Sequence, residues 1–170
     1  MGAPGDPGIP MEAVATLEDR PRAEEVMREV YRGFVRHPGA RAAFATLLGR
    51  IAEAGAPLVF HCTAGKDRTG WAAVLVLGIC GVPDDVVLDD YLATNRASGR
   101  TRDKYLGMVR EHLGADKVAV YERVMVADER YLAAAFEAVE TDYGSLAGYL
   151  GAGLGLTDPA LDALRARLVE

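Results

Sequence analysis

Cys62 and Arg68 are the residues of this chain whose types and spacing best suit a chemical reaction. They lie in the ten-residue segment HCTAGKDRTG at 61–70, between a short apolar run and a longer one. If this segment curls at Gly65, its backbone N–H groups converge beside a helix N-terminus, which favours a bound anion. The sequence therefore predicts an oxyanion-binding loop that a cysteine and an arginine both face.

Such a loop should activate the thiol of Cys62. The amide dipoles and the guanidinium of Arg68 favour the thiolate, which would move the pKa from about 8.5 into the range of about 3.5 to 7.5 seen for activated cysteines. A thiolate facing a phosphate monoester can attack phosphorus in line and form a cysteinyl-phosphate, which water then hydrolyses. We expect Cys62 to be this nucleophile.

Arg68 and Asp67 supply the other two catalytic roles. The planar guanidinium of Arg68 can hold two equatorial phosphate oxygens and offset charge in the transition state, which lysine cannot do in the same way. A leaving alkoxide or phenolate needs a proton, and Asp67 is the only carboxylate within the loop. Asp67 is therefore the expected general acid.

The remaining loop residues are expected to bind substrate or to support the loop. Lys66 offers a second cation for binding an anionic substrate. His61 is expected to orient the loop through hydrogen bonds, and Gly70 to permit close packing where the helix begins. The expected substrate-binding residues are Thr63, Ala64, Gly65, Lys66 and Thr69.

The pattern His-Cys-x5-Arg-Thr-Gly resembles the signature of the protein tyrosine phosphatase superfamily, and the full loop resembles its bacterial tyrosine/lipid phosphatase family. The similarity extends to later segments at 81–83, 90–95, 143–145 and 154–156. The resemblance implies hydrolysis of phosphotyrosine, with phosphoserine, phosphothreonine and phosphoinositides as further substrates of some members, and with no metal or other cofactor. Asp67 and Lys66 match the aspartate and lysine of that family's loop. For such substrates, the cation of Lys66 is expected to bind an additional phosphate on an inositol ring or to contact a phosphopeptide.

The surrounding elements suggest an α/β fold that is mostly helical in this chain. The apolar run at 57–61 is typical of a strand buried on both faces, and Cys62 follows its end. Hydrophobic spacing and breakers predict the helices, although the β-branched run at 118–126 also fits a strand. The helices are expected at 22–37, 40–54, 68–80, 83–95, 101–113, 116–125, 128–143, 145–150 and 159–168.

A lone strand is an incomplete sheet, because its backbone groups need partners on both sides. We therefore expect a phosphatase-like sheet flanked by helices whose N-terminal strands are missing from this chain, unless another chain completes the sheet or the run at 57–61 is not a strand. Residues 1–10, rich in glycine and proline, are expected to form a disordered arm. Residues 11–170 are then a single phosphatase-like domain, shortened at its N-terminus.

Composition limits the classes of partner. The net charge of −6 gives no general field for nucleic acid, so anionic substrates must be held by local groups. Two cysteines suggest a reducing compartment, and no apolar stretch approaches the length of a membrane span. We expect a cytoplasmic protein that binds a phosphorylated protein or a phosphoinositide, with its oligomeric state left open.

Several residues have ordinary structural explanations beside the functional ones. Trp71 and Cys80 fit the core of a buried helix, and His37 and His112 fit capping positions at helix ends.

Two other functions also stay open. One is a catalytically incomplete domain that only binds phosphorylated ligands, and the other is a redox or sulfur-transfer protein.

Overall fold

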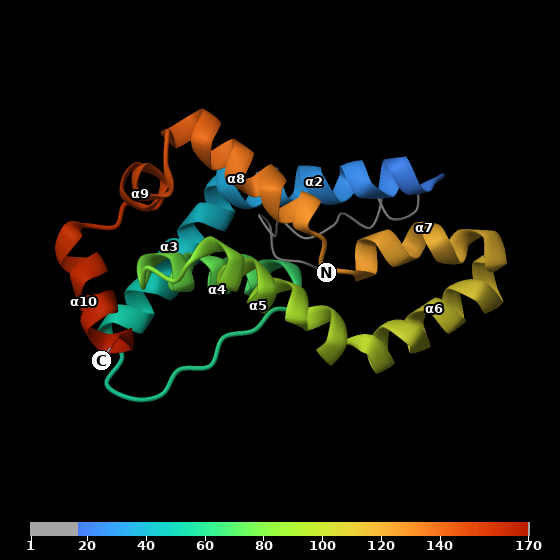
Figure 1. The fold of residues 1–170 in the computed structure, drawn as a ribbon, viewed down its shortest axis with the longest axis horizontal. Helices are drawn as coiled ribbons and strands as arrows, with labels where there is room; N and C mark the ends of the chain where they lie inside the picture. The colour runs from blue at the N-terminus through green and yellow to red at the C-terminus, as the bar shows by residue number, and fades with distance from the viewer. Residues whose placement is uncertain (1–16, 170) are drawn as a thin grey trace.

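The structure is a computed structural model that describes residues 17–169, so the arm expected at 1–10 lies outside the described residues. Within that range the chain forms helices, short turns and one long irregular segment, with no β-strand (Figure 1). The helices are α2 (Arg20–Arg36), α3 (Pro38–Glu53), α4 (Asp67–Ile79), α5 (Asp84–Ala97), α6 (Gly99–Leu113), α7 (Ala115–Met125), α8 (Glu129–Tyr143), α9 (Leu146–Gly148), the π-helical turn η1 (Tyr149–Gly153) and α10 (Asp158–Leu168).

Helix α2 is the longest element and begins where the sequence supplies a cap. The side chain of Asp19 accepts a hydrogen bond from the backbone N–H of Arg22, and a proline occupies the first turn, where its missing donor does no harm. Apolar residues then recur every three or four positions and form one buried face. That face consists of Ala23, Val26, Met27, Val30, Tyr31, Phe34 and Val35.

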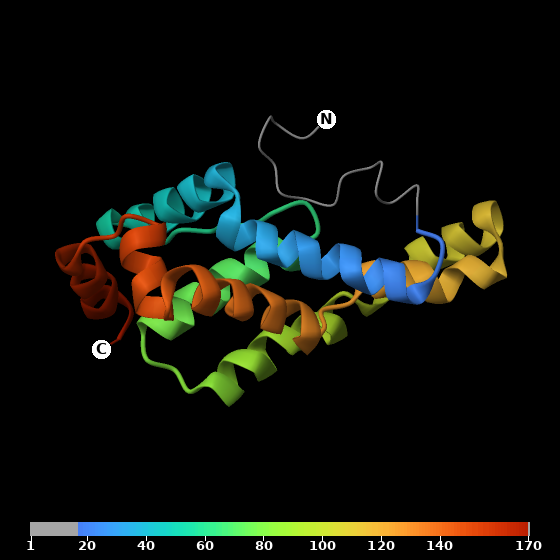
Figure 2. The same cartoon turned by 90° about the horizontal axis from the view of Figure 1, so that it is seen from above.

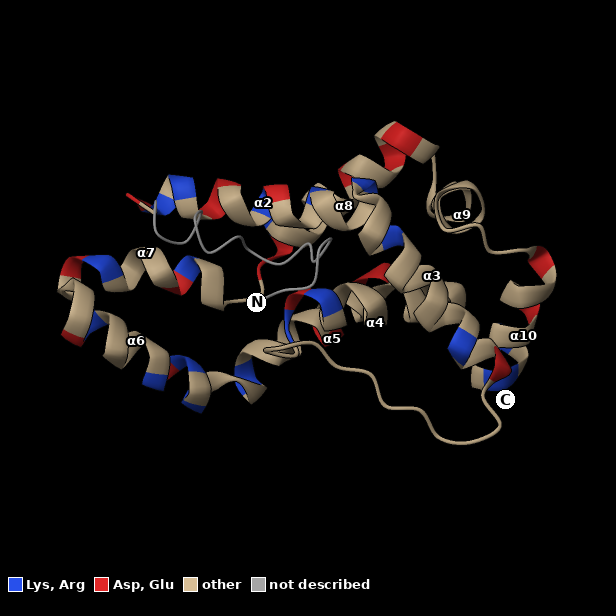
Figure 3. Cartoon of the chain, turned by 180° about the vertical axis from the view of Figure 1, so that it is seen from behind, with Lys and Arg blue, Asp and Glu red and all other residues tan. Residues whose placement is uncertain are grey.

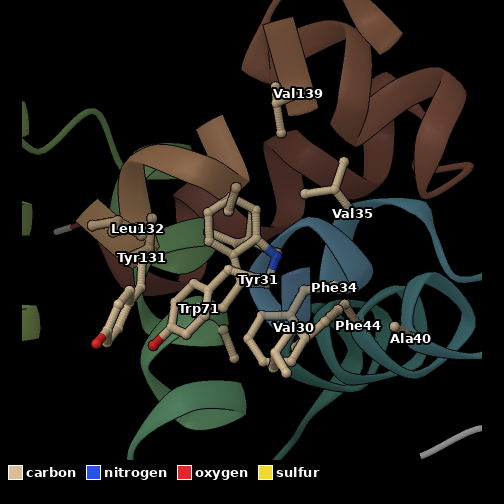
Figure 4. Packing of buried hydrophobic residues seen from close by; sticks show 14 of the residues in the cluster. Val30, Tyr31, Phe34, Val35, Ala40, Phe44, Trp71, Tyr131, Leu132 and Val139 are labelled. Carbon is tan, nitrogen blue, oxygen red and sulfur yellow. The ribbon is translucent and has the colours of Figure 1, made fainter. Parts of the chain in front are cut away.

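The buried face of α2 packs along α8, and the two helices run side by side in both views of the ribbon (Figures 1 and 2). Aromatic rings from several helices meet in this core, which Figure 4 shows from close by. The ring of Tyr31 lies 4.9 Å from that of Phe34 and 6.0 Å from that of Tyr131, measured between centroids. Trp71 of α4 is fully buried here, which confirms it as a core residue.

Helices α6 and α7 form an antiparallel hairpin at the end of the molecule away from both α3 and α10 (Figure 1). The run at 118–126, for which a strand was also considered, is helical up to Met125. Its valines at 120 and 124 recur four residues apart and are buried, so α7 packs against α2 through a helical face. Tertiary packing thus decides the structure of a segment with ambiguous propensity.

The strand expected at 57–61 is wrong for this structure. Residues 54–66 form an irregular connection between α3 and α4, and Val59 is 88% exposed. A strand is stable only when a neighbouring strand satisfies its N–H and C=O groups, and none lies within residues 17–169. The expected phosphatase-like sheet is therefore not present in the described part of the chain.

The helix expected at 145–150 also differs. It consists of one short α-helical turn that continues as a π-helical turn to Gly153. In this wider turn the backbone N–H of Leu154 donates to the carbonyl of Tyr149 at 2.8 Å, one residue further back than in an α-helix. The other predicted helices are confirmed to within two residues at each end. None of the helices described is long and apolar enough to cross a membrane.

Candidate active site

The loop before α4 places Cys62 beside the N-terminal end of a buried helix. Helix α4 begins at Asp67 with Lys66 as the N-cap, and no side chain caps its first turn. The N–H groups of a first helical turn carry partial positive charge. Gly65 has a φ of +66°, in the left-handed region that residues with a Cβ rarely adopt. The curl predicted at Gly65 is thus confirmed.

Several donors converge on the sulfur of Cys62, which is partly buried. Burial raises the pKa of this thiol, but hydrogen bonds from the Thr69 hydroxyl and from the backbone N–H groups of Thr69, Gly65 and Ala64 outweigh it, so the pKa lies below its usual value. The backbone N–H of Cys62 in turn donates to the hydroxyl oxygen of Thr69 at 3.0 Å. This convergence favours the thiolate.

Arg68 lies in the first turn of α4 and reaches back across the loop. Its Nη2 donates to the hydroxyl oxygen of Thr63 at 3.3 Å, so the guanidinium is on the same side of the loop as the residue after Cys62. The stretch from residue 54 to residue 65 carries no charged side chain, as Figure 3 shows. The positive side chains of the loop itself are therefore those near its C-terminal end, Lys66 and Arg68.

Lys66 is buried, which the sequence did not indicate. Its side chain is 7% exposed, and its ammonium lies 2.7 Å from Oδ1 of Asp67. It also donates to the backbone carbonyls of Val124 and Val126, at 3.1 and 3.2 Å. These carbonyls belong to the C-terminal end of α7, where a cation is favoured. The ammonium has three N–H donors, and all three acceptors found here are protein atoms.

Asp67 is the acidic partner of Lys66 in this ion pair. Its Oδ1 also accepts a hydrogen bond from the hydroxyl of Tyr31 in α2, at 3.0 Å. The hydroxyl of Tyr31 lies 2.7 Å from the hydroxyl of Tyr91 in α5. Neither tyrosine is among the site residues expected from the sequence. The usable signal was their hydroxyl group, because a buried tyrosine almost always has a hydrogen-bond partner.

A second contact fixes α5 against the connection between α7 and α8. The side-chain amide of Asn95 donates to the carbonyl of Ala127 and accepts from its backbone N–H, both at 2.8 Å. Asn95 and Tyr91 are one helical turn apart, so one face of α5 binds both the tyrosine pair and the α7–α8 connection. The resemblance noted at 90–95 thus coincides with residues that hold three helices together.

Residues 63–67 of the loop line a pocket of about 750 Å³, whereas Cys62 and Arg68 are not among its lining residues. The rest of the lining comes from α5, from α6 and from the C-terminal end of α7. Hydroxyl groups and one guanidinium from the two helices face this space. The lining residues outside the loop are Thr94, Ala97, Ser98, Thr101, Arg102, Tyr105, Val124 and Met125.

The remaining candidate residues lie in the loop or near the ends of α3 and α4. His61 is exposed, and its Nδ1 is 3.0 Å from the carbonyl oxygen of Cys62. Gly70 is buried within α4, and Cys80 caps the other end of that helix, with a pKa raised by burial. His37 accepts from the backbone N–H of Gly39 at the start of α3, which confirms a capping role.

His112, like His37, lies near the end of a helix. His112 contacts the carbonyl of Met108 in the last turn of α6, at 2.9 Å. Both cysteines are free thiols. Over residues 17–169, no group of three or more His, Cys, Asp or Glu side chains is arranged to hold a metal ion.

Comparison with known proteins shows a family match over nearly the whole chain. The family model described as "Tyrosine phosphatase family" matches residues 8–170. The triple specificity protein phosphatase PtpB of Mycobacterium tuberculosis is 32% identical over 99% of this chain and 62% of its own length. A Cupriavidus necator relative with a tyrosine-protein phosphatase name is 40% identical over 73% of this chain and 44% of its own length. A tyrosine-protein phosphatase of Nostoc commune is 32% identical over 74% of this chain and 44% of its length.

Proposed function

Because this chain belongs to the tyrosine phosphatase family, we propose that it is a cysteine-dependent phosphatase that hydrolyses phosphotyrosine monoesters. The chain spans between 44% and 62% of the length of the curated relatives it matches, so the activity is a proposal for this chain. The observation that carries it is the convergence of the Thr69 hydroxyl and three backbone N–H groups on the sulfur of Cys62. Such donors stabilise a thiolate nucleophile at neutral pH.

In the first step the thiolate of Cys62 attacks the phosphorus of the bound monoester. The S–P bond forms as the bond to the leaving oxygen breaks, which gives a cysteinyl-phosphate. The amides of residues 63–65, together with Thr69, bind the phosphoryl oxygens, and Arg68 holds two of them through its planar fork. Fixed donors of this kind stabilise the charge of the transition state.

Asp67 transfers the protons in both steps. Its carboxyl group protonates the leaving oxygen in the first step and takes a proton from the attacking water in the second, which releases phosphate and restores the thiolate. Its position at the first residue of α4, lining the pocket, supports this role. A thiolate nucleophile and an arginine clamp require no metal ion, so we propose a cofactor-independent reaction.

The pocket supports a broader substrate range than phosphotyrosine alone. Its volume of about 750 Å³ and its hydroxyl-rich wall leave room for groups beyond one aromatic ring. A relative is named a triple specificity phosphatase. We therefore extend the proposal to phosphoserine, phosphothreonine and phosphoinositide substrates. Lys66, which donates to protein acceptors here, is not needed as a direct phosphate ligand in this proposal.

Release of phosphate from 4-nitrophenyl phosphate tests the proposal directly. The chain should turn over this substrate in the presence of a chelator, and Cys62→Ser should abolish turnover while leaving the fold intact. Cys80→Ser is the matched control, because this thiol lies at the far end of α4 and should be dispensable. Turnover in Cys62→Ser equal to that of the unmodified chain would refute the mechanism.

A second candidate function is a domain that binds phosphorylated ligands without hydrolysing them. It is favoured by the exposed, unpaired segment before the loop, where Leu58 is 40% and Val59 88% exposed. Without support from a sheet, the loop can bind an anion yet lack the rigidity that catalysis requires. Saturable binding of a phosphotyrosine peptide, with no phosphate released over hours, would establish this function in place of the first.

A further inference from the structure

Asp67 is held from the interior by a chain of hydrogen bonds that begins far from it in sequence. Oδ1 of Asp67 accepts from the Tyr31 hydroxyl at 3.0 Å, and the Tyr91 hydroxyl lies 2.7 Å behind it. The two tyrosines come from α2 and α5, and they are 0% and 2% exposed. Three helices therefore fix the position of one carboxylate oxygen.

The direction of these hydrogen bonds follows from the carboxylate of Asp67, at which they end. A carboxylate only accepts hydrogen bonds, so Tyr31 gives its single proton to Asp67. The hydroxyl of Tyr91 must then donate to that of Tyr31. Burial is the main reason that the pKa of each tyrosine lies above its usual value, and the charge of Asp67 adds to this effect. Both hydroxyls thus stay protonated and able to donate across the physiological pH range.

Lys66 is a second donor to the same oxygen of Asp67. Its ammonium lies 2.7 Å from Oδ1, and an ammonium has no lone pair with which to accept a proton. Oδ1 is thus surrounded by two donors, one charged and one neutral. A proton carried by Asp67 must therefore be on its other oxygen, Oδ2.

We propose that Tyr31, supported by Tyr91, is a positioning residue that holds Asp67 by Oδ1 so that Oδ2 carries out proton transfer. This inference rests on the proposed function. In the first step the proton on Oδ2 moves to the leaving oxygen as the P–O bond breaks and the S–P bond forms. In the second step a water proton returns to Oδ2 as the new P–O bond forms and the S–P bond breaks.

The test compares two substrates whose leaving groups differ in basicity. Phenyl phosphate releases a strongly basic phenolate that depends on protonation, whereas 4-nitrophenyl phosphate releases a much weaker base. The quantity to measure is kcat/KM, because it reports the steps up to cleavage of the P–O bond. In Tyr31→Phe, kcat/KM for phenyl phosphate should fall by about tenfold or more, the size expected for one lost hydrogen bond to a charged group. For 4-nitrophenyl phosphate it should fall by less than about threefold.

A double-mutant cycle separates positioning from a merely structural effect. If Tyr31 acts through Asp67, then Tyr31→Phe added to Asp67→Asn causes no further loss with phenyl phosphate. An equal loss on both substrates, or a full further loss in the Asp67→Asn background, would overturn the inference. Tyr149→Phe is the matched control, since its buried hydroxyl donates to the carbonyl of Phe34 instead. It should leave the ratio of the two substrates unchanged.

A second variant keeps the test decisive if Tyr31→Phe does not fold, which circular dichroism will show. Tyr91→Phe leaves the contact between Tyr31 and Asp67 in place and removes only the donor behind it. In Tyr91→Phe, kcat/KM should again fall more for phenyl phosphate than for 4-nitrophenyl phosphate, but by a smaller factor than in Tyr31→Phe. If an active tyrosine variant loses kcat/KM equally with both substrates, the positioning role is wrong, but the proposed function still stands. If turnover of both substrates is lost only in Cys62→Ser, the proposed function is supported whatever the result for the tyrosines.

Discussion

The ring of Tyr91 lies so close to Gly70 that a Cβ on the glycine would meet two of its carbon atoms at 3.1 and 3.2 Å. Gly70 is the last residue of the candidate loop and lies near the start of α4, and Tyr91 is buried in α5. The same tyrosine carries the hydroxyl that contacts Tyr31. The absence of a side chain at Gly70 therefore sets the distance between α4 and α5 and the place of Tyr91.

Gly70→Ala should displace the ring of Tyr91 by a few tenths of an ångström. We expect a loss of stability of about 1 kcal/mol, because overpacking is partly offset by the better helix propensity of alanine. kcat/KM for phenyl phosphate should fall by about threefold, since the hydroxyl chain to Asp67 shifts with the ring. Gly33→Ala in α2 is the control, because a Cβ there meets nothing within 4 Å. Urea unfolding measures the stability, and phenyl phosphate kinetics measure kcat/KM. Unchanged values of both in Gly70→Ala would contradict this role of the glycine.

Thr69→Val should make the thiol of Cys62 harder to ionise. The hydroxyl of Thr69 is the strongest of the hydrogen bonds that lower the pKa of this thiol, and valine removes it while keeping the shape. The midpoint of the pH profile for alkylation by iodoacetamide should move to higher pH, and kcat at neutral pH should fall by about tenfold. Cys62 must be the residue alkylated, which peptide mass spectrometry checks. Thr46→Val, an exposed threonine of α3, should leave the profile in place.

Lys66→Met should destabilise the fold rather than weaken substrate binding alone. The substitution keeps the length of the side chain but leaves the carbonyls of Val124 and Val126 and the carboxylate of Asp67 without this donor. We expect a loss of about 2–4 kcal/mol in the free energy of unfolding. Lys104→Met, at an exposed position of α6, should change stability by less than about 0.5 kcal/mol. Equal stability of the two variants would show that the buried contacts of Lys66 contribute little.

Asp128→Asn should cause a loss of stability that depends on pH. Hydrogen bonds from Arg130 hold the pKa of this carboxyl below its usual value, and its side chain also caps α8. A lowered pKa means that the charged form contributes stability above the unfolded pKa of about 3.9, and this contribution disappears as the pH falls further. At pH 7 the variant should be less stable by roughly 1 kcal/mol, because asparagine retains the cap. Thermal unfolding below pH 4 should show the difference shrinking, and a constant difference would contradict the ionic origin.

The helices illustrate how far local patterns determine the fold. The apolar face of α2 is explicit in the sequence, and the structure has this helix within two residues of the predicted ends. The run at 57–61 shows the limit. Its apolar residues fit a buried strand, but strand formation depends on partners that lie elsewhere in sequence. Within the described residues those partners are absent, and Val59 is exposed to solvent.

Among the candidate site residues, the sequence by itself determined which groups the loop contains and their order. The spacing from Cys62 to Arg68, the glycine at 65 and the following helix are local features, so the pattern alone predicts an anion-binding turn. Only the tertiary structure decided where Lys66 and Asp67 point. Their partners, Tyr31 and the carbonyls of Val124 and Val126, are 36 to 60 residues away in sequence. Contacts over such separations arise when α2 and α7 pack beside α4, and local spacing carries no information about that packing.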